Sequence, residues 1–176
     1  MLGHASEAAR LLTLADIEVV WEWTSSVLGA NSEFVQVNLD HSATLAPEPR
    51  APIRMPNAYE KRQLHERDGY HCRFCGIPVV RPEVRQRLRT LYPHVVRWGK
   101  KNAERHAAFF AMRAQYDHLL PHARGGTNEL SNLVVTCSAC NYGRGGYTLA
   151  EVGLRNPMDR PPRKSTWDGL ERIFCK

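Results

Sequence analysis

Two identical cysteine pairs constrain the fold of this 176-residue chain more than any other feature. Two residues separate Cys72 from Cys75, two residues separate Cys137 from Cys140, and 61 residues lie between the pairs. Two thiolates at this spacing can chelate one ion from a single tight turn, and a second such turn completes a tetrahedral shell. We therefore expect a structural Zn²⁺ site that holds the fold together and leaves no open position for chemistry. Two disulfides or ordinary buried thiols are the alternatives; a reducing compartment disfavours the first and the repeated spacing disfavours the second.

The rest of the composition is that of an ordinary globular protein. Hydrophobic residues make up 43% of the chain and charged residues 24%, which excludes wholesale disorder. No apolar run approaches the roughly 18 residues of a membrane helix, and the N-terminus lacks the basic start and apolar stretch of a secretory signal. We expect a soluble, cytoplasmic protein with no membrane segment.

Charge is distributed unevenly along the chain. Residues 1–50 hold two basic and seven acidic side chains, whereas residues 81–113 hold nine basic and two acidic ones. This one stretch therefore carries a charge of +7, more than the net +6 of the whole protein. A concentrated basic segment indicates a polyanionic partner, although basic helices are also often only solvated faces.

Composition and periodicity divide the chain into three parts. Residues 1–56 form an acidic N-terminal appendage and a proline-rich linker, residues 57–148 a central domain, and residues 149–176 a C-terminal helical tail. In the appendage we expect helices over residues 6–12 and 14–29 and a short strand over residues 32–39. Trp21 and Trp23 are expected in the core or at an interface, so the appendage is a candidate surface for a homodimer or a protein partner.

The central domain alternates helices, strands and turns. Asn57 is a good N-cap for a helix that runs to about Arg67. A hairpin over the first cysteine pair follows, and then a basic, mostly helical insertion over about residues 81–113, broken near Pro93 and Gly99. Further elements are expected in this order: a strand over 115–120, a strand over 133–136, a helix over 138–144, and short helices over 148–154 and 167–174.

A set of polar residues surrounds the second cysteine pair. In chain order the string is Asp117-His118-Leu-Leu-Pro121, Gly125-Gly126, Asn132-Leu133 and Cys137-x-x-Cys140-Asn141-x-x-Arg144. Taken singly, each residue has an ordinary explanation as polar surface, a turn residue or a helix cap. Taken together, the string resembles the HNH nucleases, and specifically the subgroup whose ββα-metal core is braced by a four-cysteine zinc site. The resemblance covers residues 57–80 and 114–148.

The resemblance implies an α+β fold with a small ββα-metal core, and a site that hydrolyses phosphodiesters. His118 can accept a proton from water at neutral pH, and Asn132 has the family's role of orienting the imidazole. Asp117 and Asn141 offer hard oxygen ligands for a divalent metal ion. The family's final histidine is replaced by Asn141, a common variant, and we infer a preference for Mg²⁺ or Mn²⁺ in the catalytic position.

Basic residues near this site and in the insertion are candidate substrate contacts. Arg144, Arg124 and His122 are expected to bind phosphate oxygens, with solvated loop charge as the alternative. In the insertion, Arg85, Arg89 and Lys101 are expected to follow the backbone of a DNA duplex. Alternatively, the insertion covers the nuclease core or docks a protein.

These observations predict a metal-dependent endonuclease that nicks or cuts double-stranded DNA, with Zn²⁺ as structural and Mg²⁺ or Mn²⁺ as catalytic cofactor. Two other interpretations stay open: a non-catalytic zinc-ribbon module that binds DNA, and a nuclease subunit that is active only within a larger defence or restriction assembly. Binding alone would not require the set of Asp117, His118, Asn132 and Asn141.

Overall fold

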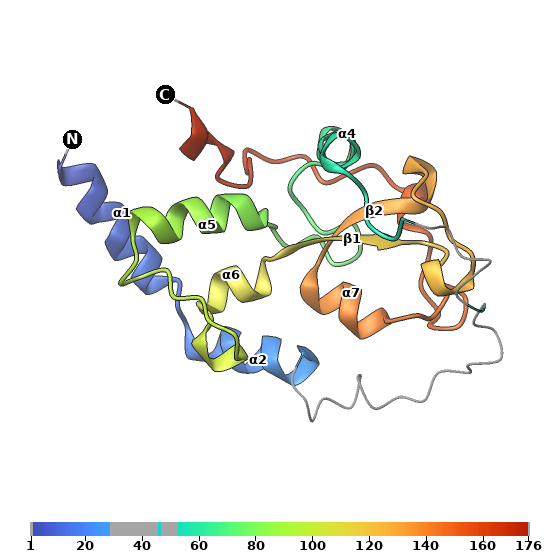
Figure 1. Cartoon of the computed structure of the whole chain (residues 1–176), viewed down its shortest axis with the longest axis horizontal. Helices are drawn as coiled ribbons and strands as arrows, with labels where there is room; N and C mark the ends of the chain where they lie inside the picture. Colours follow the sequence, from blue (N-terminus) through green and yellow to red (C-terminus); the bar gives the residue numbers. More distant parts are fainter. Residues whose placement is uncertain (1, 29–45, 47–52, 176) are drawn as a thin grey trace.

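The computed structural model describes residues 2–28, 46 and 53–175, so the strand expected over residues 32–39 lies outside the described residues. Its elements form a small α+β fold in which two of the described helices, α4 and α7, flank two strands, and α1, α2, α5 and α6 lie beyond one end of the strands (Figure 1). The elements are α1 (Leu2–Leu14), α2 (Glu18–Leu28), α4 (Ala58–Asp68), α5 (Pro82–Leu91), α6 (Ala107–Ala111), β1 (Ala114–His118), β2 (Leu133–Cys137) and α7 (Ser138–Arg144). Short 3₁₀ turns join several of them.

The two strands pair in an antiparallel ribbon at the centre of the molecule. Tyr116 lies opposite Val135, and His118 at the end of β1 lies opposite Leu133 at the start of β2. In Figure 1, α4 and α7 lie on either side of this ribbon. Every residue of β2 is buried, so the ribbon is a rigid support for the side chains at its ends.

Helix α4 begins and ends with specific hydrogen bonds. The Asn57 side chain accepts from the amides of Tyr59 and Glu60, and the Glu60 carboxylate accepts from the Asn57 amide at 2.6 Å, a complete capping box. At the other end, the buried Asp68 carboxylate accepts from the Val135 amide at 3.0 Å. The helix expected from Asn57 is confirmed, and Asp68 fixes its end to β2.

The basic insertion is less helical than its sequence predicts. Helix α5 ends at Leu91 because Pro93 disfavours helical geometry in the residue before it. Residues 92–106 are irregular apart from a 3₁₀ turn over Asn102–Glu104. The break expected near Pro93 is confirmed, and α6 leads directly into β1.

The N-terminal helices pack against the second half of the insertion. Helix α2 contacts α6 and α7, and the Trp21 indole donates to the Asn102 carbonyl at 3.0 Å. The Asp16 carboxylate pairs with Arg97 and accepts from the Ala107 amide at 2.7 Å. These bonds place α1 and α2 beside α6 (Figure 1).

The two helices expected in the C-terminal tail are largely wrong. Residues 148–154 form turns, because Glu151 bonds back to the Thr148 amide and hydroxyl and Gly153 has a positive φ of 64°. In the second segment only the 3₁₀ turn over Glu171–Phe174 is helical. The tail is tied to the central domain, since Glu171 pairs with Arg81 and the Trp167 indole donates to the Val79 carbonyl. None of the described helices has the length and apolar character needed to cross a membrane.

Candidate active site

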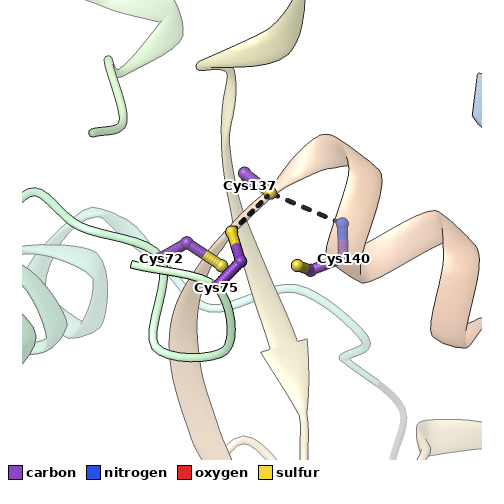
Figure 2. Close-up of side chains that lie close together, drawn as sticks. All are labelled: Cys72, Cys75, Cys137 and Cys140. Atoms are coloured by element: carbon purple, nitrogen blue, oxygen red, sulfur yellow. Dashed lines mark hydrogen bonds between the residues drawn. The ribbon is translucent and has the colours of Figure 1, made fainter. Parts of the chain in front are cut away.

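The four paired cysteines converge on one point beside the ribbon (Figure 2). All four Sγ atoms lie within 4.8 Å of one another. With Zn–S bonds of about 2.3 Å, a tetrahedral site places its sulfurs about 3.8 Å apart. The Sγ atoms of Cys75 and Cys137 are 3.8 Å apart, so the thiols fit a tetrahedral zinc ion. Among the described residues this is the one group of three or more His, Cys, Asp or Glu side chains arranged to hold a metal.

Each cysteine pair is presented by a tight turn. Around the first, the Cys72 amide donates to the Ile77 carbonyl and the Gly76 amide donates to the Cys72 carbonyl, both at 2.9 Å. Gly76 has a φ of 78°, which favours glycine there. Around the second, Cys137 ends β2 and caps α7, its sulfur accepting from the Cys140 amide at 3.4 Å.

The electrostatics of the cluster favour thiolates at the first pair. Hydrogen bonds from Cys137 and Cys140 lower the pKa of Cys72 and bring the pKa of Cys75 to about 7. Interactions within the cluster raise the pKa of Cys137 and Cys140, and because the thiolate is the form that binds metal, binding of a cation would release protons from this second pair. Cys175 is an exposed free thiol outside this group.

A hollow of about 610 Å³ opens between β1, the loop that follows it, and α7. Five of the predicted catalytic, metal-binding or substrate-binding residues line it: Asp117, His118, His122, Asn141 and Arg144. Arg54 and Met55, from the segment interpreted as linker, also line it. No sequence signal indicated their place there.

Asp117 is held by Arg144 at the floor of this hollow. The Arg144 Nε donates to Asp117 Oδ2 at 2.9 Å, and its Nη2 donates to Asp117 Oδ1 and to the His118 carbonyl. Nη1 donates to the Tyr147 carbonyl. Both side chains are buried, at 2% and 7% side-chain exposure. Burial raises the pKa of Asp117, and the guanidinium acts in the opposite direction.

This pairing corrects the role expected of Arg144. A guanidinium whose nitrogens are all engaged by the protein and which is 4% exposed is not presented to a phosphate. Arg144 follows Asn141 by three residues on α7, so helical geometry turns it toward β1, where Asp117 satisfies it.

His118 is oriented by Asn128 and not by Asn132 as the sequence predicted. The His118 Nε2 lies 2.8 Å from Asn128 Oδ1, and the Asn128 Nδ2 donates to the Ile53 carbonyl at 3.1 Å. The second bond fixes the orientation of the amide, and its oxygen can only accept. Nε2 therefore carries the proton and Nδ1 holds the lone pair. Burial lowers the pKa of His118 below its ordinary value, which favours the neutral ring.

Asn132 holds the loop that joins the two strands. Its Oδ1 accepts from the Leu120 amide at 2.8 Å, and its Nδ2 donates to the carbonyls of Leu120 and Thr127. Gly126 lies against the same place, since a Cβ there would be 1.8 Å from the Leu120 oxygen. The loop therefore closes tightly around Asn132, which positions Asn128 for its bond to His118.

Of the other predicted substrate contacts, His122 lines the hollow and the remaining residues do not. The ring centroids of His122 and His118 are 5.9 Å apart. Arg124 is paired with Glu151 at 2.8 Å and does not line the hollow. Arg85 is half-buried, whereas Arg89 and Lys101 are exposed. All three belong to the insertion, beyond the end of β1 opposite to His118 (Figure 1).

The hollow also offers oxygen donors for a second metal ion. Asp117 and Asn141 both line it, and the Asn141 side chain has no hydrogen bond to other described residues. Each Asp117 oxygen has two lone pairs, of which Arg144 uses one. Two protein ligands of this kind fit Mg²⁺ or Mn²⁺, which keep several waters and bind substrate phosphates.

Part of the chain, including this site, is similar to a known protein family. Residues 110–153 match a family model described as HNH endonuclease. The match spans both strands, the loop and α7, and with the four-cysteine cluster it confirms the resemblance to zinc-braced HNH nucleases and the α+β, ββα-metal core. No curated protein and no solved structure matched the chain.

Proposed function

We propose that this protein is a metal-dependent endonuclease that hydrolyses phosphodiester bonds in DNA. One observation carries the proposal: a neutral, oriented histidine and two oxygen donors open onto one hollow inside an HNH-type core. A protein that only bound DNA through a zinc ribbon would not need His118 buried, oriented and neutral beside a paired carboxylate.

In this proposal His118 is the general base. Its Nδ1 lone pair accepts a proton from the attacking water, and Asn128 stabilises the resulting imidazolium through Nε2–H. The lowered pKa of His118 keeps the ring unprotonated at neutral pH. Asn132 acts indirectly, because it closes the loop that carries Asn128.

Asp117 and Asn141 would hold one Mg²⁺ or Mn²⁺. When bound, such an ion offsets charge at the phosphate and the departing oxygen. Arg144 opposes the rise in the pKa of Asp117 that burial causes and holds its carboxylate in place, so we assign Arg144 a positioning role. His122 lines the same hollow and is proposed to contact a phosphate oxygen.

DNA is the proposed substrate because the insertion beside β1 is strongly basic. Arg85, Arg89 and Lys101 are proposed to contact the duplex, and Arg124 to do so only if its pair with Glu151 opens. One such active site cuts one strand, so a double-strand break needs two copies or two encounters. The metal-binding thiolates are consistent with a reducing, cytoplasmic location.

A subunit that acts within a larger assembly is the second candidate. Helices α1 and α2 and the turn between them leave several large apolar side chains exposed: Leu11, Leu14, Ile17, Val19 and Trp23. Such a surface fits a protein partner or a second copy of this chain. In that case the isolated protein would bind zinc and cut DNA only when the partner is added.

Supercoiled-plasmid nicking tests the proposal. We expect zinc-loaded wild type to nick DNA with Mg²⁺ or Mn²⁺, and His118→Ala to lose at least about 100-fold in rate with unchanged zinc content. His94→Ala is the matched control, because His94 is exposed and outside the hollow. Equal rates for wild type and His118→Ala would reject the assigned base. No cleavage by wild type in either metal would favour the subunit interpretation.

A further inference from the structure

Two arginines of the insertion lie over one tryptophan, and two more lie near the first of them. The guanidinium carbon of Arg85 lies 3.7 Å from the ring centroid of Trp98, and that of Arg105 lies 5.2 Å from the same centroid. Arg89 and Arg113 are close enough to act electrostatically on Arg85. None of these four arginines is paired with a carboxylate among the described residues.

Several donors in this cluster have no partner. The Nε and Nη1 of Arg85 and the Nε of Arg105 are buried without a hydrogen bond to any described residue. Two other arginines of the same segment are neutralised, since Arg81 pairs with Glu171 and Arg97 pairs with Asp16, and Arg87 is exposed to solvent. Unsatisfied buried donors such as those of Arg85 and Arg105 cost free energy unless a ligand supplies the acceptor.

The electrostatics also indicate a missing anion. Burial, and next the charges of Arg113, Arg89 and Arg105, lower the pKa of Arg85 to about 10, and Glu83 opposes them only weakly. Burial, and next the charge of Arg113, lower the pKa of Arg105. At neutral pH the guanidinium groups stay charged and repel one another, and a bound anion would relieve that repulsion.

We propose that Arg85, Arg105 and Arg113 form an anion site that binds backbone phosphates of the DNA strand, with Trp98 as the platform that holds the guanidinium of Arg85. This inference rests on the proposed function and adds a defined site to it. Arginine forks match phosphate geometry and stack well on an indole ring. Arg105 is held in place, since its Nη1 donates to Asn102 Oδ1 at 2.7 Å and its Nη2 to the Lys100 carbonyl at 3.1 Å, which leaves its Nε as the donor without a partner among the described residues.

The position of Arg113 beside β1 indicates how far this anion site lies from the hollow. Arg113 directly precedes β1, and it shares one face of the strand with Gln115 and Asp117, both of which line the hollow. Four residues of strand span about 13 Å, which corresponds to about four nucleotides of duplex at 3.4 Å each. Tyr142 of α7, which also lines the hollow, is close enough to Arg105 to affect its pKa. The site thus binds phosphates a few nucleotides from the scissile bond.

The test measures DNA binding without cleavage. In a zinc-loaded full-length His118→Ala background, the affinity for a short duplex is followed by fluorescence anisotropy at several salt concentrations. We expect Arg85→Leu and Arg113→Leu each to weaken binding about tenfold and to reduce the slope of log K against log salt by about one. Arg87→Leu removes the same charge from an exposed position on α5 and is the matched control.

Thermal unfolding distinguishes a binding role from a structural one. We expect Arg85→Leu to have an unchanged or higher Tm without DNA, and inorganic phosphate to raise the Tm of wild type more than that of Arg85→Leu. Slopes and affinities for Arg85→Leu and Arg113→Leu equal to those of Arg87→Leu would overturn the site, and plasmid nicking by wild type would then leave the proposed nuclease function standing. If wild type neither binds nor nicks DNA, both proposals fall.

Discussion

Arg144 donates to both carboxylate oxygens of Asp117, and through the same Nη2 it also reaches the carbonyl of His118. One guanidinium from α7 therefore holds the two adjacent residues at the end of β1 that carry the proposed chemistry. The pair is almost fully buried, so its effect on the free energy of unfolding and its effect on the cleavage rate can be measured separately.

Removing Arg144 should destabilise the protein strongly. Arg144→Ala leaves the Asp117 carboxylate buried without its partner, for which we expect a loss of about 3–5 kcal/mol in the free energy of unfolding. Arg124→Ala is the control, because its partner Glu151 is exposed to solvent and such pairs contribute little to stability. Urea unfolding of the zinc-loaded proteins measures both. Equal losses of stability for the two variants would show that the Asp117–Arg144 pair contributes no more to stability than the Arg124–Glu151 pair.

The two asparagines of the loop should have separable effects. Asn128→Ala removes the bond to His118 Nε2, so we expect kcat to fall about 10- to 100-fold with little change in Tm. Asn132→Ala removes three bonds that close the loop, so we expect a loss of about 1–3 kcal/mol in stability as well as activity. Plasmid nicking and thermal unfolding of both variants give the comparison. The opposite pattern would restore Asn132 as the residue that orients the imidazole.

Loss of one zinc ligand should unfold the region around the ribbon. We expect Cys140→Ser to lose its bound zinc and to show lower helical signal and Tm, because structural zinc contributes directly to folding. Cys175→Ser removes an exposed thiol outside the cluster and should leave zinc content and Tm unchanged. Zinc analysis and circular dichroism check both expectations. Full zinc content in Cys140→Ser would exclude a four-cysteine site.

His65 should make stability depend on pH below neutrality. Its Nδ1 donates to the Gly69 carbonyl and its Nε2 accepts from the Tyr116 hydroxyl, so the folded protein holds the neutral ring. Burial lowers the pKa of His65 below its ordinary value of 6.5. The unfolded state therefore binds more protons between the lowered pKa and about 6.5. Stability is complete above that window and falls as the pH drops through it, by up to about 1.4 kcal/mol per pH unit.

Urea midpoints between about pH 5 and pH 8 test this contribution. We expect His65→Gln to have a weaker dependence on pH than wild type. His94→Gln, the same change at an exposed position, should keep the wild-type dependence. If His65→Gln and wild type respond equally, the proton uptake on unfolding belongs to other groups.

Local patterns predicted much of the central domain. The capping box at Asn57, the break near Pro93 and the strands around Asp117 and Val135 depend on nearby residues or on short periodicities. The tail was predicted poorly, because its turns depend on the positive φ angles of Gly153 and Leu170. They also depend on contacts with the central domain, where Trp167 donates to the Val79 carbonyl and Glu171 pairs with Arg81. The pattern of apolar residues along the sequence does not predict such contacts.

The sequence by itself determined which chemistry is possible: two cysteine pairs for one metal ion, and a set of Asp117, His118, Asn132 and Asn141 that resembles the HNH nucleases. Only the tertiary structure decided which partner each of these side chains has. Asn128 reaches His118, Arg144 turns inward to Asp117, and Arg85 stacks on Trp98 without an acid. The physical reason is that such pairings join residues that are 10 to 27 positions apart, and their contacts depend on how the strands, the loop and α7 pack together.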